Sequence, residues 1–172
     1  MKLAQMGITV DVPSGWDAWF FLEENNSVVH LASFPLQREP GHSFGMNNID
    51  LMPPGGTFMA LLEYGPESAN TPLFSEARPR AVAPPDLSPR AFVSAQPGRY
   101  ARQWSFTESG RAFCLYCVVA DLDLQRPLEA TPMVGAVARA AGEATGVIAS
   151  IKIDVKPAPQ AQPPAGAVPT TP

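Results

Sequence analysis

Hydrophobic and polar residues alternate most clearly near the two ends of the chain, and this alternation predicts β-strands. In residues 8–12, Ile8, Val10 and Val12 alternate with polar residues, so these three side chains are expected on one buried face. Apolar runs bounded by polar, Gly or Pro residues predict further strands. Together these patterns predict additional strands over 19–22, 28–34, 58–64 and 151–155.

The segments between the strands carry residues that end regular structure. Residues 25–26, both Asn, suit a two-residue turn between the second and third strands. Residues 35–57 are rich in Pro and Gly and are expected to be mostly loop, with room for a short strand near 48–52. The next strand, 58–64, is apolar on both faces apart from Glu63, which predicts a central position in the sheet.

A hairpin and a helix are predicted in the last third of the folded region. The two strands of the hairpin, 100–107 and 111–120, are joined by Ser109 and Gly110. A helix over 132–149 opens with Thr as its cap and Pro in its first turn. Its apolar stripe follows helical spacing through Met133, Val137, Ala140, Ala141, Ala144 and Ile148. The small residues of this stripe would let the helix approach a sheet closely.

These elements together predict one α+β domain over residues 1–155. We expect a curved, mostly antiparallel sheet with the C-terminal helix packed on one face, connected by Pro-rich loops. The longest connection, 65–99, is rich in Pro and Arg, and 156–172 is a Pro/Ala-rich tail. Loops as long as 65–99 are uncommon in compact domains and are usually functional or disordered.

The formal charge of −4 argues against a nucleic-acid binder, which would carry a basic face. Residues 1–76 are predominantly acidic, whereas 77–111 are predominantly basic. Either this asymmetry steers a partner or favours self-association, or the two regions neutralise each other within the fold; we favour neutralisation. No apolar run is long enough for a membrane span, and no signal peptide is visible. The expected location is the cytoplasm, or a larger particle into which the chain is built.

The two cysteines are the first candidates for chemistry, because Cys114 and Cys117 form a C-x-x-C pattern. They lie within a predicted strand, where residues three apart point to opposite faces, so they are expected to be buried structural thiols. The histidines are interpreted in the same way. His30 is expected to be a satisfied, half-buried strand residue, and His42 a solvated loop residue.

Other catalytic patterns are missing from the sequence. No serine lies in a nucleophile elbow, and the Gly-rich segment 53–57 lacks the Lys of a phosphate loop. The pair Asp121 and Asp123 is not followed by the remaining ligands of a calcium loop. We therefore predict no catalytic residue, no cofactor, no metal and no enzymatic activity. The strand aromatics are assigned to the core, although they could instead line a ligand pocket.

Three segments resemble proteins of the PsbP, DcrB and Mog-like superfamily of small α/β proteins. They are the opening Gly7–Trp16, the hairpin segment Arg111–Tyr116 and the closing Ala149–Ile153. The resemblance spans roughly residues 7–155. It implies the fold predicted above and a largely non-enzymatic role, since members of the family serve as accessory subunits, lipoproteins, small-GTPase partners and secretion adaptors.

The function predicted from the sequence is therefore that of a non-catalytic, protein-binding adaptor or accessory subunit. Extended Pro-rich segments lose little entropy when they dock, so the loop is the expected binding element. The residues predicted to contact protein partners are Arg78, Arg80, Arg90, Arg99 and Arg102. A structural component of a large assembly, such as a virion, contractile injection machine or shell, is the first alternative, with homo-oligomers included among its partners. A small-ligand-binding protein built around His30 and the aromatics is the second.

Overall fold

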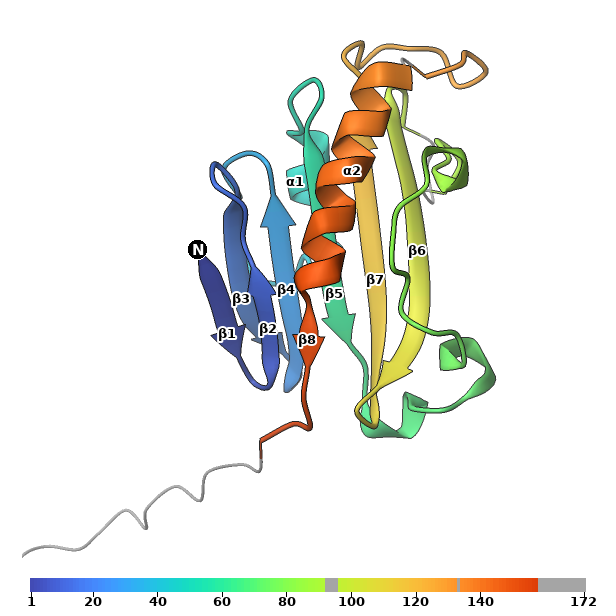
Figure 1. Ribbon diagram of the computed structural model, residues 1–172. Helices are drawn as coiled ribbons and strands as arrows, with labels where there is room; N and C mark the ends of the chain where they lie inside the picture. The colour runs from blue at the N-terminus through green and yellow to red at the C-terminus, as the bar shows by residue number, and fades with distance from the viewer. Residues whose placement is uncertain (92–95, 133, 158–172) are drawn as a thin grey trace, which may run out of the picture.

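The computed structural model describes residues 1–91, 96–132 and 134–157 and contains two antiparallel sheets (Figure 1). The three-stranded sheet has the order β1-β2-β8, and the five-stranded sheet has the order β3-β4-β5-β7-β6. The strand bounds in chain order are β1 (Lys2–Gln5), β2 (Ile8–Asp11), β3 (Asp17–Glu23), β4 (Asn26–Ala32), β5 (Thr57–Glu63), β6 (Arg99–Glu108), β7 (Arg111–Ala120) and β8 (Lys152–Ile153). The α+β class with mostly antiparallel strands and one main C-terminal helix is confirmed.

The prediction of one sheet is wrong, because the chain leaves the first sheet after β2. Pro13 and Gly15, which has a φ of 80°, turn the chain between β2 and β3. The strand β2 pairs with β1 and β8 instead of β3, and its residue Ile8 lies opposite Ile153. The predicted inward direction of Ile8, Val10 and Val12 is confirmed, since all three are buried. The strand β1, at residues 2–5, was not predicted.

The central position of β5 is confirmed, because it pairs with β4 on one side and with β7 on the other. The β6–β7 hairpin is also confirmed. Its two turn residues, Ser109 and Gly110, have φ values of 54° and 72°, which is the left-handed geometry of a tight hairpin turn. The β3–β4 turn lies one residue earlier than predicted, at Glu24 and Asn25, with φ values of 51° and 67°.

The short strand predicted near 48–52 is wrong, because this segment contains the helix α1 (Met46–Asp50). Its start depends on Gly45, whose φ is 69° and whose missing side chain leaves room for the ring of Phe58. Asn48 accepts a hydrogen bond from the backbone N–H of Gln37 at 2.7 Å and donates one to the carbonyl of Gln37 at 3.1 Å. These distant contacts hold the helix over the sheet, and local sequence gives no sign of them.

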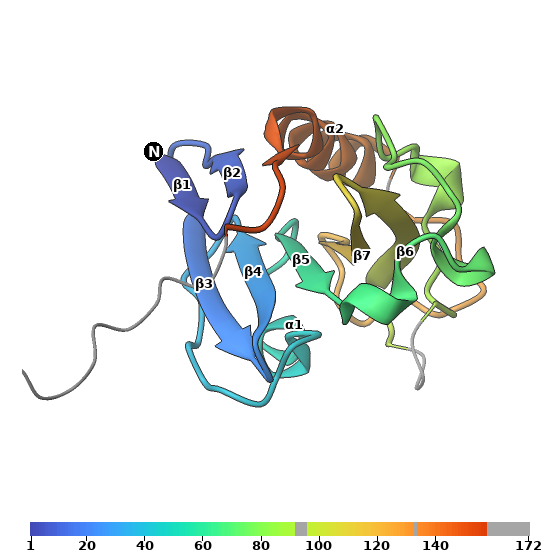
Figure 2. The same cartoon turned by 90° about the horizontal axis from the view of Figure 1, so that it is seen from below.

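The helix α2 (Val134–Ser150) covers one face of the five-stranded sheet, and α1 lies on the opposite face (Figure 2). The residues of the predicted stripe from Val137 to Ile148 are buried; Met133 lies outside the described residues. Alanines 140, 141 and 144 allow the close approach of α2 to β2, β5 and β7. None of the helices in the described ranges is long and apolar enough to cross a membrane.

Each face of the five-stranded sheet has its own hydrophobic core. The larger core joins this sheet to α2 and to the three-stranded sheet, and includes Leu61, Leu115 and Ile148. The smaller core lies beneath α1 and includes Phe58, Ile49 and Met52. Because β5 and β7 contribute side chains to both cores, every residue of these two strands is buried.

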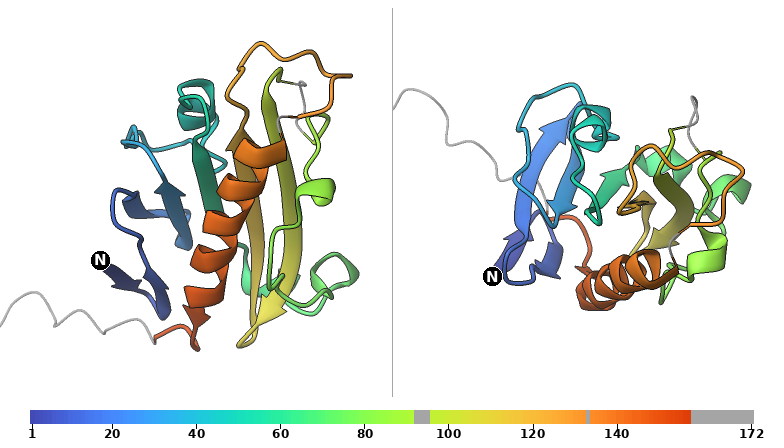
Figure 3. Two further views of the ribbon diagram at one scale, coloured as in Figure 1. Left: turned by 45° about the horizontal axis from the view of Figure 1, so that its top comes forward. Right: turned by 90° about the horizontal axis from the view of Figure 1, so that it is seen from above.

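The long Pro-rich connection runs beside β6, at the opposite side of the molecule from the β1–β2 hairpin (Figure 3). It contains the 3-10 turns η1 (Pro66–Ser68), η2 (Pro72–Phe74) and η3 (Pro84–Asp86). Glu76 and Ser88 form isolated bridges to Phe106 and Ala101 of β6, so the loop covers this sheet edge. Of the predicted Pro/Ala-rich tail 156–172, residues 158–172 lie outside the described residues.

A buried ion cluster joins the two sheets where β5 and β7 meet the β1–β2 turn. The Nε of Arg111 donates to Oε1 of Glu63 at 2.9 Å, and the two side chains are 6% and 4% exposed. Arg111 Nη1 also donates to the carbonyls of Met6 and Asp154, each at 3.0 Å. The other oxygen of Glu63 accepts hydrogen bonds from Ser27 N at 3.0 Å and from Lys156 Nζ at 3.2 Å. One carboxylate and one guanidinium thus connect β5, β7, the first hairpin and the segment after β8.

Glu63 remains ionised in this buried position because its oxygens are hydrogen-bonded. Burial alone would raise the pKa of Glu63, but the hydrogen bonds from Arg111 and Ser27 and the charge of Arg111 outweigh burial and lower the pKa from 4.5 to about 2. A carboxyl with a lowered folded-state pKa stabilises the fold above its unfolded pKa. This contribution is therefore complete above pH 4.5 and is lost as the pH falls towards about 2.

We expect Glu63→Gln to reduce the free energy of unfolding at pH 7 by about 3–5 kcal/mol, because Arg111 is left as an uncompensated buried charge. The variant should also lose the acid dependence below pH 4.5, of which about 2 kcal/mol falls between pH 4.5 and pH 3. Urea unfolding between pH 7 and pH 3 measures both effects. Glu76→Gln, at an exposed carboxyl, is the matched control. Equal losses in the two variants would contradict the role of the ion cluster.

Candidate functional site

The five arginines predicted to contact partners do not converge on one site. Arg78 forms an ion pair with Glu108 at 3.0 Å and also donates to the carbonyl of Ile151, just beyond the end of α2. Arg102 pairs with Asp86 at 3.2 Å and lies 5.2 Å from the ring centre of Trp104. These contacts hold the Pro-rich connection against β6 and α2.

The other three arginines differ in their surroundings. Arg90 pairs with Glu129 at 3.1 Å, and Arg99 donates to the backbone carbonyl of Ile49 at 3.0 Å, at the end of α1. Arg80 is exposed and, with Arg78, lines a hollow of about 420 Å³. Their contact with a protein partner remains a prediction, although internal contacts already engage all of these arginines except Arg80 within the described residues.

The charge asymmetry of the sequence is only slightly neutralised across its two regions. Among the described residues, Glu63–Arg111 is the one ion pair that joins 1–76 to 77–111. The remaining arginines pair mainly with acids close to their own strand or loop. As a result, Glu23 and Glu24 at the end of β3 have no ion pair within the described ranges.

His30 is completely buried, and not half-buried as predicted. Its Nε2 lies 2.7 Å from the carbonyl oxygen of Ser43, and the rings of Phe21 and Phe58 meet its ring edge to face at 5.2 Å. Burial lowers the pKa of His30, although the hydrogen bond to Ser43 opposes this effect. A neutral imidazole that donates from Nε2 fits this cage. The ring holds the loop before α1 in place and has no access to a substrate.

The two cysteines are buried free thiols, as predicted. Cys117 belongs to the larger core, and its neighbour Tyr116 belongs to the smaller core, so alternation places Cys114 on the opposite face. Burial raises the pKa of Cys114 to about 11 and that of Cys117 to about 12. Thiols with such pKa values are poor nucleophiles and poor metal ligands.

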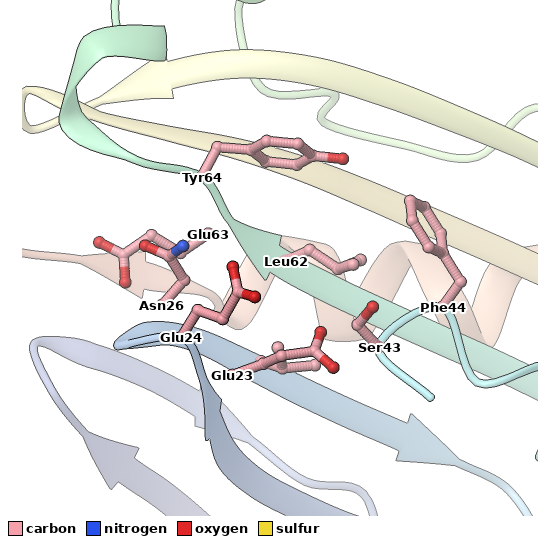
Figure 4. Close-up of a pocket in the computed structure, with 9 residues that line it drawn as sticks. Glu23, Glu24, Asn26, Ser43, Phe44, Leu62, Glu63 and Tyr64 are labelled. Atoms are coloured by element: carbon pink, nitrogen blue, oxygen red, sulfur yellow. The ribbon is translucent and has the colours of Figure 1, made fainter. Parts of the chain in front are cut away.

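A pocket of about 330 Å³ lies at the end of β5, beside the β3–β4 turn (Figure 4). Glu23 and Glu24 contribute carboxylates to its lining, Phe44 and Tyr64 contribute rings, and the Glu63 side chain turns away towards Arg111. Burial raises the pKa of Tyr64, so neither Tyr64 nor Glu63 titrates near neutrality. Across the described ranges, no three His, Cys, Asp or Glu side chains come together as metal ligands.

The most unusual feature outside the cores is the free edge of β3. In a two-residue hairpin the residues next to the turn form a hydrogen-bonded pair, so alternate residues of β3 direct their backbone groups outward. The outward residues are Ala18, Phe20 and Leu22. At Ala18, the N–H is bound by Asp17 at 2.8 Å and the carbonyl by Arg38 at 3.4 Å.

The rest of this edge, which comprises Phe20 and Leu22, lacks a backbone partner within the described residues. Leu22 is 51% exposed, and the stacked rings of Trp19 and Phe21, 4.1 Å apart, are only half-buried. Natural edge strands are commonly protected by Lys, Pro or a covering loop, and β3 contains neither Lys nor Pro. The opposite edge of the same sheet, β6, is covered by the Pro-rich connection.

The sequence pattern assigned Trp19, Phe20 and Phe21 to the core and did not identify this edge. A usable signal was present, because an apolar run bounded by Asp17 and Glu23 contains no residue that would block pairing. Comparisons of the chain with family models, with curated proteins and with solved structures found no match. The resemblance inferred from the sequence is neither supported nor opposed by this result.

We expect the cage around His30 to make stability depend on pH between about 5 and 7. Because its pKa is lowered on folding, the folded state binds fewer protons, and stability is lost progressively as the pH falls below 6.5. His30→Gln, which keeps a donor for Ser43, should abolish this slope in urea unfolding. His42→Gln, at the exposed histidine, should keep it. Retention of the slope in His30→Gln would show that another group causes it.

Proposed function

We propose that this chain is a non-catalytic, protein-binding accessory subunit that joins its partner by adding a strand to the free edge of β3. The observation that carries the proposal is the unequal treatment of the two edges of the five-stranded sheet. A long loop covers β6, whereas the outward backbone groups of Phe20 and Leu22 lack partners within the described residues. Main-chain hydrogen bonds at such an edge bind an extended segment of another chain.

The composition of β3 supports the same proposal. An added strand would cover the exposed part of Leu22 and the half-buried rings beside it, so pairing would also bury apolar surface. The edge strand of the other sheet, β1, is less suitable. It has only four residues and begins with Lys2, which is the usual protection of an edge.

A non-catalytic role is supported by the way in which the titratable groups are used. His30 holds the loop before α1, and Glu63 with Arg111 joins the two sheets. The two thiols are buried, with raised pKa values. These groups lie in separate places and do not surround one reacting atom. A small-ligand function would rest on the acidic pocket next to Tyr64. The buried polar residue in its lining, Glu63, already has a structural role in the ion cluster.

A capped seven-residue peptide tests the proposal. In this fluorescent probe, Val and Thr alternate between two terminal lysines, so it favours an extended chain. We expect saturable binding by fluorescence anisotropy, and a loss of at least about tenfold in Leu22→Pro, which removes one outward N–H and leaves the ladder to β4 intact.

Leu22→Ala is the matched control, since it also removes the exposed side chain but keeps the N–H. Its affinity should fall by less than about threefold relative to the native chain. Unfolding midpoints of both variants should remain close to that of the native chain, because Leu22 is half-exposed. Absence of binding by the native chain, or equal affinities of the two variants, would refute strand addition at β3.

A further inference from the structure

We infer that the strand that pairs with β3 is β3 of a second copy of this chain, so that two five-stranded sheets join into one continuous antiparallel sheet. The inference rests on the proposed function, because it names the partner of the same edge. It is carried by three properties of β3: the direction of its outward backbone groups, the apolar side chains along it, and the different charges at its two ends.

The backbone of β3 is complementary to itself in one antiparallel register. When Phe20 lies opposite Phe20 of the second copy, Ala18 lies opposite Leu22, and all the outward residues meet outward residues. In this register all seven residues of β3 are paired, and any shift along the strand would reduce the number of paired residues. Pairing at Ala18 replaces the hydrogen bond that its N–H donates to Asp17 Oδ1 and the 3.4 Å bond that its carbonyl accepts from Arg38. A two-fold axis through Phe20 relates the two chains, as in most homodimers.

The side chains in this register are also complementary. Trp19 lies opposite Phe21 of the second copy on one face, which brings the Trp19–Phe21 stacks of the two copies side by side. On the other face, Phe20 meets its own counterpart. Aromatic pairs directly across two strands are among the more stabilising cross-strand pairs. Leu22, the most exposed residue of the strand, is covered beside Ala18.

At both ends of β3 the same arrangement brings a cation of one copy to an acid of the other. At one end, Arg38 pairs with Asp17 at 2.7 Å through Nη2. This guanidinium is half-exposed, and Nη2 is its one hydrogen-bonding nitrogen within the described ranges. At the other end, Glu23 and Glu24 have no ion pair there. The two-fold register places Asp17 of each copy opposite Glu23 of the other, and Arg38, which pairs with Asp17, lies next to both carboxylates and offsets their repulsion.

These two symmetric junctions allow a test by charge exchange. Arg38→Glu alone leaves only acids at both junctions. Adding Glu23→Arg to the same chain sets the new cation opposite Asp17, so both junctions become attractive again. Analytical ultracentrifugation of the native chain should show a dimer. Arg38→Glu alone should dissociate at least about tenfold more readily, and the double variant should regain affinity to within about threefold.

Two further variants separate the charge effect from effects on folding. Arg38→Gln removes the pair with Asp17 without adding a negative charge, so its dimer should be weakened less than that of Arg38→Glu. Leu22→Pro should be monomeric and folded, as judged by its circular dichroism and unfolding midpoint. A fold defect caused by Arg38→Glu would lower the affinity of the double variant as well, which the proposed register does not allow.

The outcomes distinguish this inference from the proposed function. A native chain that stays monomeric at 100 µM but binds the Val/Thr peptide would refute the second copy and leave strand addition standing. A monomer that binds no peptide would refute both. A dimer that Leu22→Pro leaves intact, or a double variant no tighter than Arg38→Glu alone, would place the interface elsewhere and refute the pairing of β3 with itself.

Discussion

The buried pair formed by Glu63 and Arg111 is the contact on which the arrangement of the two sheets depends. Hydrophobic packing between the sheets is non-directional and would allow them to slide. The guanidinium instead requires two carbonyls, at Met6 and Asp154, in fixed positions. Gly7 fits this requirement, because its φ is 74° and an added Cβ would lie 3.1 Å from Arg111 Nη1. The charge of Arg111, the turn conformation at Gly7 and the positions of the two carbonyls therefore all fit the same contact.

This contact explains why the small three-stranded sheet can exist. Its strand β8 has two residues and β1 has four, which is too little pairing for independent stability. The sheet is held instead by burial against α2 and by the ion cluster at its turn. The five-stranded sheet has longer strands and a core on each face, so it acts as the rigid body to which the rest is attached.

The two edges of the five-stranded sheet differ in whether another segment of the chain covers them. The connection from β5 to β6 returns along β6 and is fixed there by bridges and by the ion pairs of Arg78 and Arg102. In the described part of the chain, the loop after β4 contacts only the Asp17 end of β3, through Leu36 and Arg38, and leaves the edge at Phe20 and Leu22 without backbone partners. Two of the five arginines that composition marked as a binding surface, Arg78 and Arg102, thus help to close one edge. The apolar residues that periodicity marked as core lie at the other edge, and it is this strand that we propose to meet another chain.

Local pattern was sufficient for the elements whose structure depends on near neighbours. Strand alternation placed Ile8, Val10 and Val12 inward, and Ser109 with Gly110 supplied a turn geometry that determines the β6–β7 register. The helix α2 followed from its stripe of small apolar residues. The helix α1 could not be predicted in this way, since Asn48 is held by Gln37 and Gly45 is required by Phe58, neither of which is a neighbour in the sequence.

The sequence by itself determined the α+β class, the central position of β5, the late hairpin and the inert character of the two thiols. These properties follow from side-chain periodicity and turn chemistry, which act over a few residues. Only the tertiary structure decided that there are two sheets, that Glu63 meets Arg111, and that β3 is an edge while β6 is covered. Each of these depends on which distant segments pair, and the free energy of such pairing is shared among side chains too far apart in the sequence to form a pattern.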